Sequence, residues 1–213
     1  ALRKSGYRPN LNKKLNHLKC LCSTGSPLSP EGFQFISQHI KSDMQIGSIS
    51  GGTDILSCFV LNNPLDDVVS GEIQGIGLGM SVEVFDHNGV SITDEPGELV
   101  CTKPFPSMPV MFWNDPDGKK YRDAYFNYYP NIWRHGDWTK ITERGTLIIY
   151  GRSDATLNPG GVRIGTSEIY QQVENIDFIT EGLVVGQDYK DDVRIVLFIT
   201  TRNNEELDDE KIK

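Results

Sequence analysis

The segment YGRSDATLNPGGVR, residues 150–163, separates two parts of the sequence that follow different patterns. Between residues 71 and 150, short alternating segments are separated by turn signals rich in Gly, Pro, Asn and Asp. After residue 163, one segment of helical period precedes two apolar stretches of strand length. The first pattern is typical of antiparallel sheets, and the second of a mixed α+β domain. We therefore predict a domain boundary here, with a hinge near Asp154.

The antiparallel part is predicted to be a barrel or a sandwich. Its expected strands are Ser81–Phe85, Gly97–Lys103 and Thr146–Tyr150. A long segment rich in aromatic residues and Pro, Lys103–Asn131, interrupts them. Linkers rarely carry this many aromatic residues, so we expect an ordered but irregular excursion.

The residues before residue 71 have the pattern of an α/β segment. Pro30–Lys41 is predicted to be a helix that has Ser29 as its N-cap and apolar residues on one face. Met44–Ile49 is predicted to be a short strand, which leads into the loop Ser50–Asp54.

The last part of the chain is predicted to hold a hairpin, a helix and two strands. These elements are expected at Asn158–Gly161, at Thr166–Asn175 with Thr166 as N-cap, and at Leu183–Gly186 and Arg194–Thr200. Residues 203–213 are acidic and have the pattern of the first part of a further helix.

The composition of the 213 residues is that of a soluble globular protein, with 38% hydrophobic and 23% charged residues. No run of 18 apolar residues occurs, so we expect no transmembrane helix and no membrane partner. A net charge of −8 argues against non-specific nucleic-acid binding, but it leaves a local nucleotide site open. The chain has neither an initiator Met nor a signal peptide, so we expect it to start inside a longer polypeptide.

The four cysteines are expected to be buried thiols of a protein from a reducing compartment, the cytosol. Only Cys20 and Cys22 are close in sequence, and one intervening residue suits neither a zinc knuckle nor a redox pair. A metal or disulfide role for these two, or for Cys58 and Cys101, is the alternative.

The loop Ser50–Asp54 has the residue types that a nucleotide needs. Glycines allow the backbone to approach a ligand, the Thr53 hydroxyl can donate to a phosphate oxygen, and the Asp54 carboxylate can hold Mg²⁺. The alternative is an ordinary glycine turn.

The segment Trp133–Trp138 places Asp137 between aromatic residues, in what we interpret as a turn. A carboxylate in this position can accept both hydroxyls of a ribose. The alternative is a turn Asp that caps local backbone amides. His135 is expected to be a packed surface ring rather than a catalyst.

Two arginines, Arg152 and Arg163, follow in glycine-containing segments. Their planar donors suit hydroxyl or phosphate oxygens, and a structural ion pair is the alternative for each. Glu168 is expected in the first turn of the following helix, where the helix dipole favours it.

The segment Gly75–Gly79 is similar to a dinucleotide-binding loop but has the spacing G-x-G-x-G. No helical pattern follows it, so we interpret it as a simple turn before a strand.

Taken in order, these segments resemble the adenylate-forming superfamily of acyl-CoA synthetases over nearly the whole chain. The matching segments are Gly25-Ser26-Pro27, Ser50–Asp54, Gly97-Glu98-Leu99, Gly136-Asp137, Gly151–Asp154, Gly161–Ile164 and Glu168-Ile169-Tyr170. The resemblance implies an α/β fold. Residues 1–153 would be the later part of the large domain, with an α/β segment (1–70) and a barrel-like subdomain (71–153). Residues 154–213 would hold the hinge and part of the small α+β domain.

The resemblance also implies a nucleotide site. Thr53 would bind the α-phosphate, Asp137 and Arg152 would hold the ribose hydroxyls, and Asp54 would help to hold Mg²⁺. Asp54 stands where the family usually has Glu, so its metal contact would run through water. The full set of implied nucleotide-binding residues is Gly25, Ser26, Pro27, Gly52, Thr53, Asp137 and Arg152.

Further roles follow from the same resemblance. Thr53 and Arg163 would be catalytic, Gly161 would leave room for the pantetheine arm of CoA, and the small domain would swing about Asp154. Ser50, Gly51 and Gly52 would line the acyl pocket. Relatives that activate acetate carry Trp at the position aligned with Gly51, so the glycines are expected to open the pocket to acetoacetate, a four-carbon keto acid.

The implied reaction joins acetoacetate to CoA through an acyl-adenylate, with ATP, Mg²⁺ and CoA as cofactor and co-substrates. A phosphate-binding loop ending in Lys and a C-terminal adenylation lysine are absent from the sequence, so we expect the 213 residues alone to be inactive. The alternatives are a ligase for another short or medium acid and a non-catalytic nucleotide-binding module.

Overall fold

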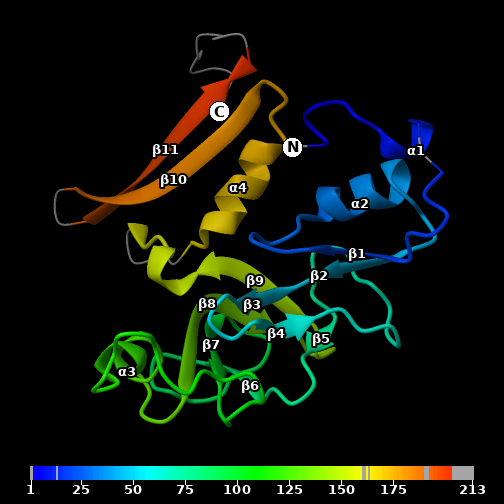
Figure 1. Ribbon diagram of the computed structural model, residues 1–213. Coiled ribbons are helices and arrows are strands. Elements are labelled where there is room, and N and C mark those ends of the chain that lie inside the picture. Colours follow the sequence, from blue (N-terminus) through cyan, green and yellow to red (C-terminus); the bar gives the residue numbers. More distant parts are fainter. Residues whose placement is uncertain (1, 13, 160–161, 163, 190–191, 203–213) are drawn as a thin grey trace. The chain divides into compact units, whose positions relative to one another are not determined.

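The computed structural model describes residues 2–12, 14–159, 162, 164–189 and 192–202 (Figure 1). The chain divides into two compact units, Arg8–Asp154 and Ala1–Tyr7 with Ala155–Lys213. The division therefore lies beside Asp154. Residues 1–7, which the sequence analysis assigned to the first domain, group instead with the second unit. The correspondence of the two units to the large and small domains of the superfamily stays a prediction.

The first unit begins with a short helix, α1 (Pro9–Asn12), and a β–α–β segment. Strand β1 (Cys20–Ser23) pairs in parallel with β2 (Gln45–Ser48), and helix α2 (Pro30–His39) connects them. The predicted N-cap is confirmed, because Ser29 Oγ accepts a hydrogen bond from the Gly32 amide at 3.2 Å. The apolar face of α2 forms a small core whose buried members are Phe33, Phe35, Ile36, Ile40 and Ile46.

Two antiparallel sheets complete the first unit, and the four-stranded one confirms that residues 71–150 form antiparallel strands. The three-stranded sheet has the order β3-β4-β5, with bounds Ser50–Gly52, Ser57–Leu61 and Gly75–Ile76. The four-stranded sheet has the order β6-β7-β8-β9, with bounds Val82–Phe85, Gly97–Cys101, Trp133–Ile141 and Leu147–Arg152.

Three segments of these sheets differ from the sequence predictions. The segment Gly75–Gly79, interpreted as a simple turn, begins with strand β5, which pairs with β4. The segment Trp133–Trp138 is not a turn, because it lies within the nine-residue strand β8. The loop Ser50–Asp54 begins as strand β3 and turns only after Gly52. In the segments Trp133–Trp138 and Ser50–Asp54 a glycine suggested a turn, whereas pairing with a neighbouring strand of the sheet holds the segment in a strand.

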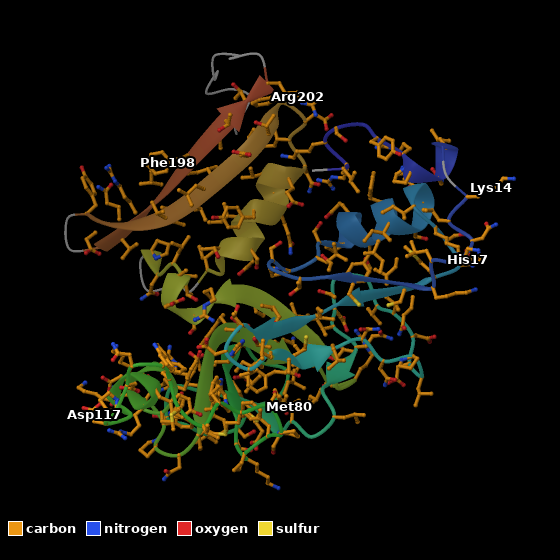
Figure 2. All side chains as sticks on the ribbon, in the orientation of Figure 1. Lys14, His17, Met80, Asp117, Phe198 and Arg202 are labelled. Carbon is orange, nitrogen blue, oxygen red and sulfur yellow. The ribbon has the colours of Figure 1, made fainter. Side chains whose placement is uncertain are left out.

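A core of aromatic and aliphatic side chains takes its members from both antiparallel sheets. Met80, which Figure 2 labels, packs against this core. Trp133 is 2% exposed and stacks on Tyr125 with a distance of 3.6 Å between ring centroids. The predicted excursion 103–131 contributes Tyr125 and is irregular apart from α3 (Lys119–Tyr125). The buried Asp115 carboxylate accepts from the amides of Lys120 and Tyr121, which satisfies two of the free amides at the start of that helix.

The second unit holds α4 (Thr166–Glu174) and the antiparallel pair β10 (Ile179–Tyr189) and β11 (Asp192–Thr201). A short 3₁₀ turn, Ser153–Ala155, lies at the division between the units. An antiparallel bridge between Leu157 and Ile164 flanks the predicted hairpin. The prediction for residues 203–213 lies outside the described residues.

The predicted N-cap of α4 was wrong by one residue. The cap is Gly165, whose amide donates to Glu168 Oε1 at 2.9 Å. Thr166 is the first helical residue. Glu168 lies in the first turn, as expected, and there it satisfies a free amide directly.

The prediction that all four cysteines are buried was also wrong. Cys101 is buried and Cys58 is half-buried, but Cys20 and Cys22 are exposed. They alternate with Leu21 along β1, and Leu21 packs against the α2 core. Successive strand residues face opposite ways, so both thiols lie on the other face, with their Sγ atoms 3.7 Å apart.

Among the residues that the structure describes, no helix combines the length and the apolarity that crossing a membrane requires.

Candidate nucleotide-binding site

A cavity with a volume of about 580 Å³ lies in the first unit, between the loop after β1 and the strands β3 and β9. Its size lies within the range of small-molecule sites. Much of the predicted site lines this one cavity. The predicted residues that do so are Gly25, Ser26, Pro27, Ser50, Gly51, Gly52, Thr53, Asp137 and Arg152.

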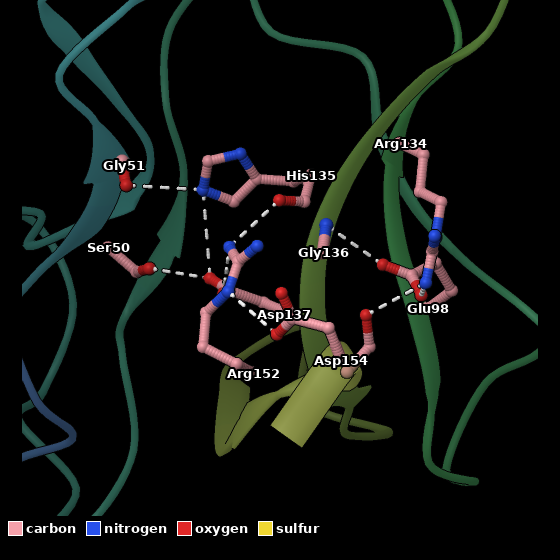
Figure 3. Close-up of polar contacts among 10 residues, drawn as sticks. Ser50, Gly51, Glu98, Arg134, His135, Gly136, Asp137, Arg152 and Asp154 are labelled. Carbon is pink, nitrogen blue, oxygen red and sulfur yellow. Dashed lines mark hydrogen bonds and ion pairs between the residues drawn. The ribbon is translucent and has the colours of Figure 1, made fainter. Parts of the chain in front are cut away.

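Asp137 is the buried carboxylate of this cavity, and it is 6% exposed. Its Oδ2 accepts a hydrogen bond from Ser50 Oγ at 3.1 Å, and its Oδ1 accepts from Arg152 Nη1 at 3.2 Å (Figure 3). A carboxylate has about four lone-pair sites, so these two contacts leave acceptor capacity for further donors.

A bulge in β8 explains why Asp137 faces the cavity. Trp138 of β8 pairs with Glu98 of β7, but Arg134 pairs with Val100. Residues 135–137 of β8 therefore stand opposite the single residue Leu99. Such bulges bend a strand and redirect its side chains, and they are common next to functional sites.

Gly136 at the centre of the bulge has φ +85°, a conformation that glycine adopts without strain. A Cβ atom there would lie 2.4 Å from Nη2 of Arg152. The guanidinium therefore packs directly against the glycine backbone, and any side chain at this position would displace it.

Arg152 stabilises the bulge through hydrogen bonds from the cavity side. Its Nη1 donates to the His135 carbonyl at 3.0 Å as well as to Asp137, and its Nε donates to Asp154 Oδ1 at 3.4 Å. The structural ion pair considered for Arg152 is thus present. The Arg152 side chain also lines the cavity, so it can form this ion pair and still contact a ligand.

His135 is buried, with 8% exposed, so the expectation of a surface ring was wrong. Its Nε2 donates to the Gly51 carbonyl at 3.1 Å, and its ring lies edge-on to Phe59 at 4.8 Å. Burial lowers the pKa of His135, although the nearby Asp137 carboxylate opposes this shift. The neutral ring therefore joins β8 to β3 across the back of the site.

Gly51, which is expected to open the acyl pocket, lies directly against the neighbouring strand β4. A Cβ atom on Gly51 would lie 2.0 Å from the Ser57 carbonyl oxygen of β4. A side chain at this position would therefore collide with the neighbouring strand. Gly52 is less crowded, but a Cβ atom there would still make a tight contact with Cε1 of His135 at 3.2 Å, besides an ordinary contact with a carbon of Ile55 at 3.9 Å.

Asp54, the predicted magnesium ligand, is exposed and follows Thr53 at the edge of the cavity. Its Oδ2 accepts a hydrogen bond from the Tyr125 hydroxyl. In the described part of the chain, no three or more His, Cys, Asp or Glu side chains lie close enough together to hold a metal ion. The single carboxylate of Asp54 would nevertheless suit Mg²⁺, which usually takes its other ligands from phosphates and water.

Two predicted site residues cannot be located in the structure, and one residue near the site had no predicted role. Gly161 and Arg163 lie outside the described residues. Sequence reasoning quoted Glu98 only as part of a motif and gave it no role, although it contacts the Gly136 amide. The available signal was a single carboxylate within the apolar strand segment GELVC.

Comparisons with known proteins identify relatives of this chain. The chain is 59% identical over 207 residues to the acetoacetyl-coenzyme A synthetase of Rhizobium meliloti (strain 1021), covering 97% of the chain and 32% of that protein. It is 45% identical over 215 residues to the acetoacetyl-CoA synthetase of Gallus gallus, covering the whole chain and 32% of the relative. No family model matches the chain.

Solved structures give the same assignment. The acetoacetyl-CoA synthetase from Streptomyces lividans has a TM-score of 0.88 and 45% identity, over 99% of this chain and 32% of that one. The anthranilate CoA ligase AuaEII, in complex with anthranoyl-AMP, has a TM-score of 0.78 over 98% of this chain and 39% of its own. At 17% identity, the second match shows the fold alone.

The chain thus belongs to the adenylate-forming superfamily of acyl-CoA synthetases, as its motifs predicted. Within this superfamily it is homologous over its whole length to the acetoacetyl-CoA synthetases. It spans about a third of the length of these relatives.

Proposed function

We propose that this chain supplies the nucleotide-binding part of an AMP-forming acetoacetate–CoA ligase. The observation that carries the proposal is the convergence of Ser50, Asp137 and Arg152 on one cavity in a chain homologous to acetoacetyl-CoA synthetases. In the proposed reaction, the acetoacetate carboxylate attacks the α-phosphorus of ATP and releases pyrophosphate. The thiol of CoA then attacks the acyl carbonyl and releases AMP.

The first task of the site is to hold the nucleoside. Gly25, Ser26 and Pro27 form one wall of the cavity and would contact the adenine. Asp137 would accept the two ribose hydroxyls through its remaining lone pairs, while Arg152 keeps the carboxylate in place. This arrangement fixes the α-phosphate relative to the protein before the acid arrives, which lowers the entropic cost of the reaction.

The second task is to stabilise charge on the phosphate. Thr53 lines the cavity directly after the glycines of β3, and its hydroxyl would donate to an α-phosphate oxygen. Mg²⁺, held by Asp54 and the phosphates, would supply positive charge to the developing oxyanion. Ser50, Gly51 and Gly52 would form the wall against which the acyl group lies.

The remaining roles are those that the resemblance to the superfamily assigns. Arg163 would approach the phosphate during thioester formation, Gly161 would admit the pantetheine arm, and Asp154 would act as the hinge. We place the enzyme in the cytosol, where its small-molecule substrates ATP and CoA are available.

The direct test is an assay of the complete open reading frame for ATP- and CoA-dependent thioester formation. Acetoacetate should be preferred over acetate, butyrate and 3-hydroxybutyrate. A preference for another acid would keep the chemistry and reject the substrate. A folded protein without activity on any of these acids would favour a non-catalytic nucleotide-binding module.

A further inference from the structure

Glu98 is the one charged residue of strand β7, whose five residues are all buried. Its side chain is 7% exposed. A buried carboxylate is costly unless it is paired and hydrogen-bonded, so its partners show what it holds in place.

The first partner is the backbone of the β8 bulge. Glu98 Oε1 accepts a hydrogen bond from the Gly136 amide at 2.9 Å, and this contact is buried. The bulge removes the regular pairing of β8 with β7 at this point, so the carboxylate takes the place of a strand acceptor.

The second partner is Arg134, whose Nη2 lies 2.9 Å from Glu98 Oε2. The same Nη2 donates to Ser153 Oγ at 3.1 Å, and the guanidinium lies 4.8 Å from the Tyr128 ring centroid. Ser153 stands between Arg152 and Asp154 in the chain. Glu98 is thereby connected both to the residue before Asp137 and, through Arg134, to the residue after Arg152.

These contacts lie across β8 from the cavity. Figure 3 shows Glu98 and Arg134 on one side of the strand and Ser50, Asp137 and Arg152 on the other. Gly136 is held by the carboxylate through its amide, while the Arg152 guanidinium packs against its Cα. Loss of the carboxylate would free the bulge to rotate, and Asp137 would turn with it.

We propose that Glu98 is a positioning residue that fixes the β8 bulge, through Gly136 and Arg134, so that Asp137 and Arg152 face the nucleotide. The inference rests on the proposed role of Asp137 in binding the ribose. Glu98 does not touch the nucleotide. It acts by holding the side chains of Asp137 and Arg152 in the orientation that contacts the nucleotide.

The functional test uses the ribose hydroxyls as probes. The complete open reading frame is titrated with ATP and with 2′,3′-dideoxy-ATP, which lacks both hydroxyls. In Glu98→Ala, the affinity for ATP should fall about tenfold, the size expected for a charged hydrogen bond, while the affinity for the dideoxy nucleotide stays unchanged. Equal losses for both nucleotides would assign Glu98 a general structural role and overturn the proposal.

Glu83→Ala is the matched control. Glu83 lies on the neighbouring strand β6 and accepts from Thr102 Oγ1 at 2.9 Å, away from the bulge. It should leave both affinities unchanged. If Glu98→Ala does not fold, Glu98→Gln takes its place. This variant keeps an oxygen for the Gly136 amide but loses the charge that holds Arg134, so a smaller loss specific to ATP is expected, and no loss would overturn the proposal.

A second measurement separates this inference from the proposed function. Hydrogen exchange of the Gly136 amide is compared between the 213-residue wild-type chain, Glu98→Ala and Glu98→Gln. Exchange should accelerate in Glu98→Ala but remain slow in Glu98→Gln. Slow exchange in both variants would contradict the positioning role. If the wild type binds ATP and the dideoxy nucleotide equally well, the proposed contact of Asp137 with the ribose is rejected. The exchange rate of the Gly136 amide would then still show whether Glu98 fixes the bulge.

Discussion

Asp137 shows how much of the site depends on single atoms. Its two carboxylate oxygens are held by Ser50 from β3 and by Arg152 from β9, so three strands meet at one side chain. The sequence indicated a carboxylate able to bind ribose. It gave no indication of Ser50 as its partner, because the two residues are 87 positions apart.

Asp137→Asn should lower the affinity for ATP about tenfold or more. The amide group of Asn would present a donor to Ser50 or Arg152, and it would lose acceptor sites for the ribose hydroxyls. Isothermal titration with ATP measures the effect. Asp43→Asn, at an exposed carboxylate that pairs with Lys41, is the control and should bind ATP as the wild type does. An unchanged affinity in Asp137→Asn would contradict the assignment of the ribose contact.

His135 gives a prediction for pH dependence. Burial lowers its pKa from the ordinary value of 6.5, so below that value the unfolded chain binds a proton more readily than the folded one. The stability that depends on the neutral ring is complete above about pH 6.5 and is lost as the pH falls below it.

Urea unfolding between pH 5 and pH 8 measures this contribution. His135→Gln keeps a donor for the Gly51 carbonyl but cannot titrate, so its free energy of unfolding should fall less steeply below pH 6.5 than that of the wild type. Parallel curves for the two proteins would show that His135 titrates normally in the folded state.

At the scale of elements, local sequence rules located the start of α2 but missed strand β8. Ser29 followed by Pro30 marked the start of α2, since N-capping depends on neighbouring residues only. Strand β8 was missed because its bulge breaks the alternation from which strands are recognised, and because Gly136 suggests a turn. The contacts of β8 with β7 and β9 keep this segment extended, and such long-range pairing has no signature in a short window.

The glycine-rich strand β3 shows the same dependence on a neighbouring strand. Sequence reasoning assigned Gly51 to the acyl pocket, where the absence of a side chain would leave space for a larger acid. The structure adds that β4 occupies the place of its Cβ atom. A Trp at Gly51 would therefore disturb the pairing of β3 with β4 before it could close a pocket.

Gly51→Ala should lower the free energy of unfolding by about 1–3 kcal/mol, because the added methyl group overpacks against the Ser57 carbonyl. Gly75→Ala in β5 of the same sheet is the matched control, since a Cβ atom there meets nothing within 4 Å. Its effect should be about 0.5 kcal/mol or less. Urea unfolding of the two variants decides the matter, and equal stabilities would contradict the contact.

At the scale of the whole molecule, the change of pattern around residue 154 coincided with the division between the two units. The placement of residues 1–7 with the second unit could not be predicted. It depends on contacts such as that of the Arg3 guanidinium with the Glu174 carbonyl, at 2.6 Å across 171 positions of sequence. Pattern reasoning therefore locates a change of domain but not the segments that return to it from the other end of the chain.

The proposed reaction predicts where one carboxylate oxygen of acetoacetate ends up. If acetoacetate is activated as an acyl-adenylate, one carboxylate oxygen becomes the bridge to the α-phosphorus, and it leaves with AMP when CoA attacks the carbonyl carbon. The complete open reading frame is supplied with acetoacetate carrying a heavy oxygen isotope in its carboxylate, together with ATP, Mg²⁺ and CoA, and the products are analysed by mass spectrometry. We predict one heavy oxygen in each AMP and none in pyrophosphate. Heavy oxygen in inorganic phosphate, with ADP as the other product, would contradict the adenylate mechanism.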